Sequence, residues 1–274
     1  MEIHVLGPLT ACEKGVSFVP SAAKPRQIFA LLVLRNGRVV TVPTLMEELW
    51  GAELPRSAAT TLQTYILQLR RGLRGVLGPA GGDAKDVLGT RHGGYLLDLP
   101  VCAIDARTFD QLTAEGYAAY DTGDPETASR LLTRALALWA GPVLADVRQG
   151  RLLEVEAVRL RESRMAALER RIDADLWLGH HHEVLGELAG LTAEHPMHEN
   201  LHGQFMLALY RCGRVSQALE TFHRLRATLV GELGLEPSER LRRLQQAVLH
   251  ADPALDWRTG LSDADSRLPA PARL

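Results

Sequence analysis

The clearest alternation of apolar and polar positions along the chain lies between residues 57 and 73. Its apolar side chains recur at spacings of four, three and four residues, at Leu62, Ile66, Leu69 and Leu73. That spacing predicts a helix with one buried face, and Ser57 is a suitable N-cap residue for it. At about 100° per residue, the opposite face displays Thr60, Thr64, Leu67, Gln68 and Arg71, with Thr61, Gln63 and Arg70 on its flanks.

The residues before this helix mix strand and helix signals. Two short apolar runs, 3–9 and 16–20, are joined by the turn-like sequence CEKG and predict an antiparallel start. Apolar side chains at near-helical spacing then predict helices over 25–36 and 41–51, each ending at a glycine or an Asn-Gly pair.

The residues after it predict a β-hairpin. Residues 78–82 read as a loop, and DVLGTRHGGYLLDL reads as two strands around the tight, basic turn 91–94. A small sheet, three helices and a hairpin, in that order, make a winged helix-turn-helix. In such folds the third helix enters the major groove of DNA, and the hairpin touches the flanking backbone or the minor groove.

Beyond Pro100 the pattern becomes all-helical. The expected helices cover 105–121, 125–139, 150–178, 181–194, 198–212, 215–231 and 237–250. Short antiparallel helix pairs at this spacing are typical of tetratricopeptide-type stacking. The predicted fold class is therefore α+β and mostly helical, with a winged helix over 1–100, an all-α tetratricopeptide-like domain over 101–252 and a mobile tail over 253–274.

Composition narrows the class of protein. Apolar residues make up 46% of 274 residues, which indicates a globular chain. No apolar run approaches the roughly 20 residues of a membrane span, and the N-terminus lacks a signal-peptide pattern. The three cysteines are far apart and form no C-x-x-C pair, so a disulfide framework or a zinc knuckle is not expected. We expect a cytoplasmic protein without a membrane partner.

Charge is distributed unevenly. The formal net charge is −2, which alone argues against a nucleic-acid binder, but residues 1–100 carry +3 and the remainder −5. Such asymmetry suggests that one part of the chain meets an anionic partner.

One string of five residues matches a metal-binding motif. Residues 198–202 spell His-Glu-Asn-Leu-His, which matches the H-E-x-x-H motif of zinc proteases. A third ligand is needed to close such a site, and no histidine follows within the next turn or two. Pro196 instead suits the start of a helix, where Glu199 would face the positive end of the dipole. We interpret the match as a coincidence of letters.

Two stretches of the N-terminal region, LQTYILQLRRGL and RHGGYLL, resemble the DNA-binding half of the Streptomyces antibiotic regulatory proteins, whose winged helix is similar to that of OmpR-type response regulators. The likeness continues through IDARTFDQL, ALALWAGPVLAD, the long stretch from LGELAGL to GELGLEP, and LQQAVL, which resemble that family's bacterial transcriptional activation domain. It covers nearly all of residues 1–252.

The resemblance implies a transcriptional activator of an antibiotic or other secondary-metabolite gene cluster. Its expected partners are double-stranded promoter DNA, bound at direct repeats by protomers side by side, and RNA polymerase holoenzyme, through its sigma factor and core subunits. The protein would then be associated with the nucleoid. No enzymatic activity, catalytic residue, metal or cofactor is expected.

The candidate DNA-binding residues fall into three sets. The groove-facing candidates are Thr60, Thr61, Gln63, Thr64, Leu67 and Gln68, whose amides and methyl groups can contact base edges. The phosphate candidates are Arg70, Arg71 and Arg91, with His92 at the minor groove. For Lys24 and Arg26, phosphate contact and plain solvation are equally open. Relatives often carry a basic residue where this chain has Gln68, which puts any borrowed operator sequence in doubt.

Two alternative functions remain open from the sequence. One is a zinc hydrolase that uses His198, Glu199 and His202. The other is a helical-repeat adaptor whose winged helix binds protein instead of DNA.

Overall fold

A computed structural model describes residues 1–77, 83–100 and 103–257. The chain forms two compact units. The first contains Met1–Ala114 and Arg134–Ala166, and the second contains Glu115–Thr133 and Ala167–Leu274. These units differ from the domains expected from the sequence, whose limits stay a prediction. Within the described ranges, no helix is both long enough and apolar enough to cross a membrane.

The first unit begins with a three-stranded antiparallel sheet. Its strands are β1 (Glu2–His4), β2 (Thr10–Glu13) and β3 (Val16–Ser17), in that order. The expected antiparallel start is present, but the run 3–9 is not one strand. Only its first residues belong to β1, and the tight hairpin joins β2 to β3 through Lys14 and Gly15.

Three helices follow, as expected: α1 (Ala23–Leu34), α2 (Val42–Trp50) and α3 (Ala58–Leu77). Residues 27–34 of α1 are all buried, so this helix is the centre of the core. The ring of Phe18, which follows β3, lies directly on α3: a Cβ added at Gly72 would come within 1.8 Å of it.

A second antiparallel sheet completes the winged helix. It has the order β4–β6–β5, with β4 (Val39–Thr41), β5 (Leu88–Arg91) and β6 (Gly94–Leu97). The short helix α4 (Ala84–Val87) precedes β5, and neither α4 nor β4 was expected. The strands β4 and β6 approach closely because a Cβ at Gly94 would lie 2.2 Å from the carbonyl oxygen of Val40.

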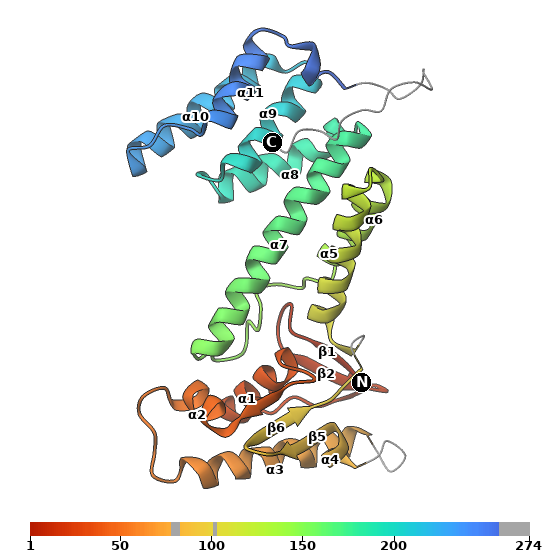
Figure 1. The fold of residues 1–274 in the computed structure, drawn as a ribbon, viewed down its shortest axis with the longest axis vertical. Helices are drawn as coiled ribbons and strands as arrows, with labels where there is room; N and C mark the ends of the chain where they lie inside the picture. Colours follow the sequence, from red (N-terminus) through yellow and green to blue (C-terminus); the bar gives the residue numbers. More distant parts are fainter. Residues whose placement is uncertain (78–82, 101–102, 258–274) are drawn as a thin grey trace. The chain divides into compact units, whose positions relative to one another are not determined.

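The rest of the described chain is helical. Its helices are α5 (Asp105–Asp121), α6 (Pro125–Leu136), α7 (Arg151–Leu178), α8 (His181–Glu194), α9 (Glu199–Arg211), α10 (Val215–Leu233) and α11 (Glu239–Leu249), followed by the 3-10 turn η2 (Pro253–Leu255). Figure 1 follows them along the chain. All seven expected helices are present, and the predicted fold class is confirmed.

A buried carboxylate joins α2 to the beginning of α7 inside the first unit. Glu48 is 3% exposed. It accepts hydrogen bonds from the backbone N–H groups of Gly150 (2.7 Å), Leu152 (2.8 Å) and Leu153 (3.3 Å). The Gln27 side chain donates to the same carboxylate at 2.9 Å. Glu48 therefore caps α7 from another element and satisfies N–H groups that have no partner within the helix.

Asp105 makes a second connection of this kind. Its carboxylate accepts hydrogen bonds from the backbone N–H groups of Val5 at 2.9 Å, Leu6 at 3.0 Å and Ala106 at 2.7 Å. It thus ties the residues after β1 to the start of α5. Burial raises the pKa of Asp105, and these backbone donors oppose the shift.

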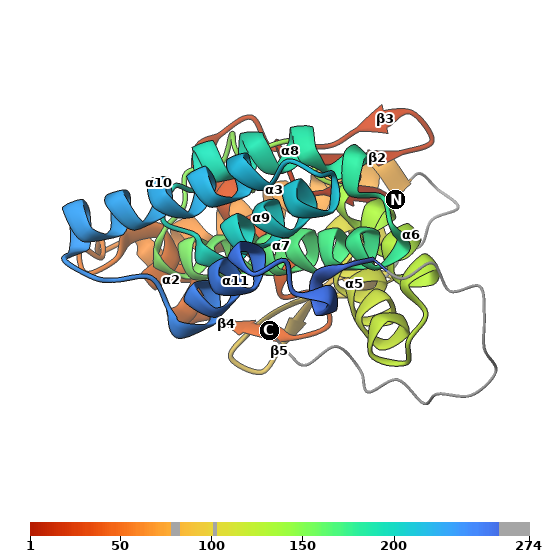
Figure 2. The same ribbon diagram turned by 90° about the horizontal axis from the view of Figure 1, so that it is seen from above.

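The second unit is built from packed helices. Helix α9 packs against both α8 and α10, and α11 packs on α9 and α10 (Figures 1 and 2). The core side chains come from α9, α10 and α11: Met206, Leu209, Ala218, Phe222, Leu225, Leu229, Leu241 and Val248. Helix α10 ends at Gly234, whose φ of 68° is the left-handed conformation that glycine favours at a C-cap.

The first residues of the expected tail are ordered. Residues 253–255 form η2, and the Trp257 indole nitrogen donates to the Trp177 carbonyl oxygen at 3.0 Å. The sequence missed this because a single anchoring tryptophan carries no periodic signal. Residues 258–274 lie outside the described residues.

We expect Glu48→Gln to lower the free energy of unfolding by about 3 kcal/mol. The amide keeps the shape of the side chain but presents N–H groups to the α7 N–H donors and removes the buried negative charge. Urea unfolding measures the loss. The control is Glu47→Gln, because the neighbouring Glu47 pairs with Arg151 at an exposed position and should cost under about 1 kcal/mol. Equal losses would contradict the capping role.

We expect His181→Phe to make the protein less sensitive to acid. Burial lowers the pKa of His181 to about 4, and neither ring nitrogen has a partner among the described residues. The folded state therefore binds this proton more weakly than the unfolded chain. The stability that neutral His181 contributes is complete above about pH 6.5 and is lost as pH falls toward about 4.

Urea unfolding at several pH values between these limits tests this expectation. The curve for His181→Phe should be flatter than that of the wild type, and the curve for His182→Phe, which changes an exposed neighbour, should not. Parallel curves for the wild type and His181→Phe would contradict it.

Candidate nucleic-acid interface

One face of α3 stands clear of the core of the first unit. Its exposed residues are Thr60, Gln63, Thr64, Leu67, Gln68 and Arg71, and we call this set the α3 stripe. Leu67 is 52% exposed, so this face includes an apolar side chain among the polar ones. On the opposite face, Leu62, Ile66, Leu69 and Leu73 are each at most 1% exposed. The four-three-four spacing therefore divides the helix as the sequence predicts.

Two of the predicted groove-facing threonines use their hydroxyl groups locally. Thr64 Oγ1 donates to the Thr60 carbonyl oxygen at 3.1 Å. Thr61, which is half-buried at the edge of the stripe, donates to Ser57 Oγ at 3.4 Å. The first bond holds the Thr64 hydroxyl against the helix backbone, so the methyl group of Thr64 is the part that faces outward, and the second joins the Thr61 hydroxyl to the Ser57 side chain.

Arg70 and Arg71 are adjacent in sequence but lie in different surroundings. Arg71 is exposed, whereas the half-buried Arg70 turns toward the hairpin. Arg70 Nε donates to the Leu88 carbonyl oxygen at 2.9 Å, and an Nη donates to Thr90 Oγ1 at 2.9 Å. The sequence predicts that the Arg70 guanidinium contacts a phosphate. In the structure it joins α3 to the β5–β6 hairpin, residues 88–97, which we call the wing.

The tip of the wing is exposed and basic. Arg91 and His92 are both exposed, and the hairpin turns at His92 and Gly93, where a φ of 75° requires a glycine-type conformation. Arg91 donates to the Thr90 carbonyl oxygen at 3.2 Å, so its guanidinium stays close to the hairpin backbone. Figure 1 places this hairpin beside α3.

Lys24 and Arg26, on the first turn of α1, both have partners within the protein. The Lys24 ammonium lies 4.6 Å from the centre of the Trp50 ring. Arg26 donates to the Pro20 carbonyl oxygen at 2.9 Å and to Asp146 Oδ2 at 2.8 Å. Arg26 is therefore a structural anchor of the segment before α7, and the sequence offered no signal for a partner 120 residues away.

Arg74 is an exposed cation that the sequence analysis missed. It lies three residues after Arg71 on α3, its side chain is 66% exposed, and it approaches Asp83 at 3.8 Å. A helical spacing of three residues places it beside Arg71 on the same face. Extending the periodic pattern beyond Leu73 would have found it.

Residues of the His-Glu-Asn-Leu-His string serve the helix packing of the second unit. His198 Nε2 lies 3.1 Å from Glu169 Oε1, and Glu199 accepts a hydrogen bond from the Ser238 backbone at 2.8 Å. Nδ1 of the buried His202 lies 3.1 Å from the His198 carbonyl oxygen. Across the ranges that the structure describes, no three His, Cys, Asp or Glu side chains are grouped so that they could hold a metal ion. Helix α9 begins at Glu199 with His198 as its N-cap, one residue after the expected start, and Pro196 lies in the turn before the helix and not at its first position.

Two known families match successive stretches of the chain. Residues 18–97 match the family described as transcriptional regulatory protein, C terminal. Residues 104–249 match the bacterial transcriptional activator domain.

Individual relatives agree with these matches. The chain is 54% identical to regulatory protein DnrI of Streptomyces peucetius, over 93% of this chain and 94% of that protein. It is 41% identical to regulatory protein AfsR of Streptomyces coelicolor, of which it spans only 25%. Among solved structures, Mycobacterium tuberculosis EmbR in complex with a low-affinity phosphopeptide matches with a TM-score of 0.87 and 34% identity, over 92% of this chain and 65% of that one.

We expect Arg70→Ala to loosen the wing without unfolding the protein. The substitution removes two charge-assisted hydrogen bonds at a half-buried position, which should cost about 1–2 kcal/mol. Amide hydrogen exchange should accelerate selectively in residues 88–97. Arg70→Lys should rescue little, because an ammonium cannot span both acceptors as a planar fork does.

The matched control is Arg71→Ala, one residue along the helix. It should change the free energy of unfolding by less than about 0.5 kcal/mol and leave exchange in the hairpin unchanged. An equal effect of the two alanine substitutions would show that Arg70 does not hold the wing.

Proposed function

We propose that this chain, which belongs to the Streptomyces antibiotic regulatory protein family of transcriptional activators, binds promoter DNA sequence-specifically through α3 and the wing. The observation that supports this most is the α3 stripe: a continuous row of exposed Thr, Gln and Leu side chains with arginine at one end. A solvated helix face ordinarily carries more charge than this one.

Helix α3 has the size and chemistry to lie in a major groove. The groove is about 12 Å wide and admits one α-helix with its side chains. Gln63 and Gln68 can each donate and accept on the edge of an adenine, and Leu67 can pack on a thymine methyl group. Neutral side chains of this kind distinguish bases, whereas phosphate contacts carry no sequence information.

The cations around the stripe serve to position the helix on the duplex. Arg71 and Arg74 extend the stripe toward the end of α3, and Arg91 and His92 lie at the wing tip. Arg70 acts indirectly, by holding the wing against α3. Because residues 1–100 carry a net charge of only +3, one protomer has little electrostatic affinity for DNA.

Weak binding by one protomer favours occupancy by two or more. Protomers bound side by side on direct repeats raise each other's effective concentration. A further contact with RNA polymerase holoenzyme, through its sigma factor or core subunits, would stabilise the complex at the promoter and activate transcription. The target genes are those of an antibiotic or other secondary-metabolite cluster.

The proposal predicts different effects for two residues of the stripe. Gln68→Ala should reduce discrimination between a cognate and a scrambled duplex by about 1–3 kcal/mol. Arg71→Ala should weaken binding to both duplexes equally and reduce the slope of log K against log salt by about one unit. Fluorescence anisotropy over a salt series, with duplexes taken from the promoters of the neighbouring gene cluster, measures both quantities.

Equal losses on the two duplexes for both variants would contradict the role of Gln68 in base reading. A wild-type protein that binds none of the promoter fragments would contradict DNA binding itself and favour the protein-binding adaptor. Footprinting on the same fragments tests the repeats, because side-by-side protomers should protect two or more equally spaced segments.

A further inference from the structure

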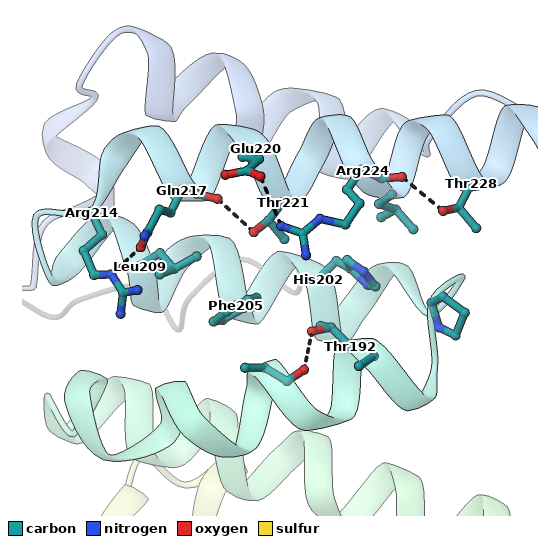
Figure 3. Close-up of a pocket in the computed structure, with 14 residues that line it drawn as sticks. Thr192, His202, Phe205, Leu209, Arg214, Gln217, Glu220, Thr221, Arg224 and Thr228 are labelled. Atoms are coloured by element: carbon teal, nitrogen blue, oxygen red, sulfur yellow. Dashed lines mark hydrogen bonds and ion pairs between the residues drawn. The ribbon is translucent and has the colours of Figure 1, made fainter.

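The second unit contains an open groove that no part of the DNA-binding proposal uses. It lies over α9, between α8 and α10, and has a volume of about 450 Å³ (Figure 3). Pockets for ligands typically measure about 300–1,000 Å³, so this groove has room for a row of side chains but not for a whole helix.

The two walls and the floor differ in character. On the α8 side the lining residues are short, with Ala189 and Ala193 among them. The floor is apolar where Phe205 and Leu209 of α9 line it. An occupant can therefore approach α8 closely and bury apolar side chains against α9.

The α10 wall is a polar row in helical register. Five of its lining residues recur at spacings of three and four, Arg214, Gln217, Thr221, Arg224 and Thr228, and Glu220 and Leu225 of the same helix also line the groove. From the N-cap Arg214 to Thr228 there are 14 residue steps, or about 21 Å at 1.5 Å per residue. Such a row runs parallel to any occupant that lies along the groove.

Positive charge predominates among the lining side chains. Arg214 donates to the neutral amide oxygen of Gln217, and Arg224 approaches Glu220 at 3.6 Å with both side chains largely exposed. Figure 3 shows the guanidinium of Arg224 pointing toward His202, with the carboxylate of Glu220, which also lines the groove, next to it. Burial lowers the pKa of His202, so this side chain is neutral near pH 7.

We propose that this groove binds an amphipathic helix of a partner protein, with an apolar face of about four turns and acidic residues along one flank. The apolar face would fill the space above Phe205 and Leu209. The acidic flank would lie along α10, where Arg214 and Arg224 offer charge-assisted hydrogen bonds.

A helix suits the groove better than an extended peptide. An extended peptide needs partners for its backbone N–H and C=O groups. The walls are helices whose own backbone groups are already paired, and the floor is apolar, so they present no sheet edge to such a peptide. A helix satisfies its own backbone and needs only side-chain contacts.

Three fluorescent peptides test the proposal on the full chain. All have 16 residues and the same leucine face, and their flanks carry glutamate, lysine or glutamine. We expect the glutamate peptide to bind at least about tenfold more tightly than the lysine peptide, because like charges at an interface are repulsive. Anisotropy titrations at low salt measure the three affinities.

Two variants test whether the peptides bind in this groove. Ala193→Trp fills the α8 side of the groove and should weaken binding of the glutamate peptide at least tenfold. Arg224→Glu should reverse the preference between the glutamate and lysine peptides. The matched control is Ala227→Trp, which adds the same bulk at an exposed position of α10 outside the groove lining. Circular dichroism melts confirm that each variant folds.

Equal affinities for the acidic and basic peptides, or binding that survives Ala193→Trp, would overturn the proposal. Two other occupants would also overturn it. If self-association of the free protein is lost in Ala193→Trp, the groove holds a second copy. If removal of residues 258–274 increases peptide affinity at least tenfold, the groove holds the chain's own tail. DNA binding by Ala193→Trp is measured in parallel. This measurement shows whether a loss of peptide binding is independent of the proposed function.

Discussion

The arrangement of the first unit depends on the hydrogen bonds that the buried Glu48 carboxylate accepts. A buried carboxylate is costly to desolvate, and this one is stabilised because three backbone N–H groups at the start of α7 and the Gln27 amide point at it. The same N–H groups would otherwise be unpaired helix-terminal donors. The N–H groups therefore stabilise the buried carboxylate, and the carboxylate gives the N–H groups the acceptors that the helix lacks. A helix of the DNA-binding segment and a helix of the activator segment become parts of one compact unit.

Two further contacts also join segments of the same unit that are far apart in the sequence. Asp105 joins the backbone after β1 to the start of α5, and Arg26 joins α1 to Asp146. Together the three contacts connect the winged helix to residues about a hundred positions later. Deformation of the winged helix would have to break the buried hydrogen bonds of Glu48 and Asp105 and the more exposed ion pair of Arg26, so α3 is carried by a unit larger and stiffer than a winged helix alone.

Local spacing explains why so much of this fold could be predicted. The exposed face of α3 and the limits of most later helices follow from periodicity, capping residues and turns, which act within a few residues. The sequence could not reveal Glu48 as the cap of α7, because that contact depends on which buried faces meet in three dimensions. The same reason explains Arg26 and Trp257, whose partners are 120 and 80 residues away. The His-Glu-Asn-Leu-His string shows the converse, a local match without a matching three-dimensional arrangement. Within the described residues, its two histidines belong to no group of three side chains that could hold a metal ion.

Arg70 and Arg71 show how one helical step separates two uses of the same side chain. A rotation of about 100° turns Arg70 to the wing and leaves Arg71 in solvent. Because Arg70 sets the position of the hairpin, the distance between the α3 stripe and the wing tip is fixed before any DNA is bound. In the proposed DNA complex, a preorganised surface would lose little conformational entropy on binding, which would offset part of the weak electrostatic attraction of a segment, residues 1–100, with a net charge of only +3. In the proposed complex, sequence preference would depend on neutral Gln, Thr and Leu side chains, whose contacts would form fully only with the helix at one depth in the groove.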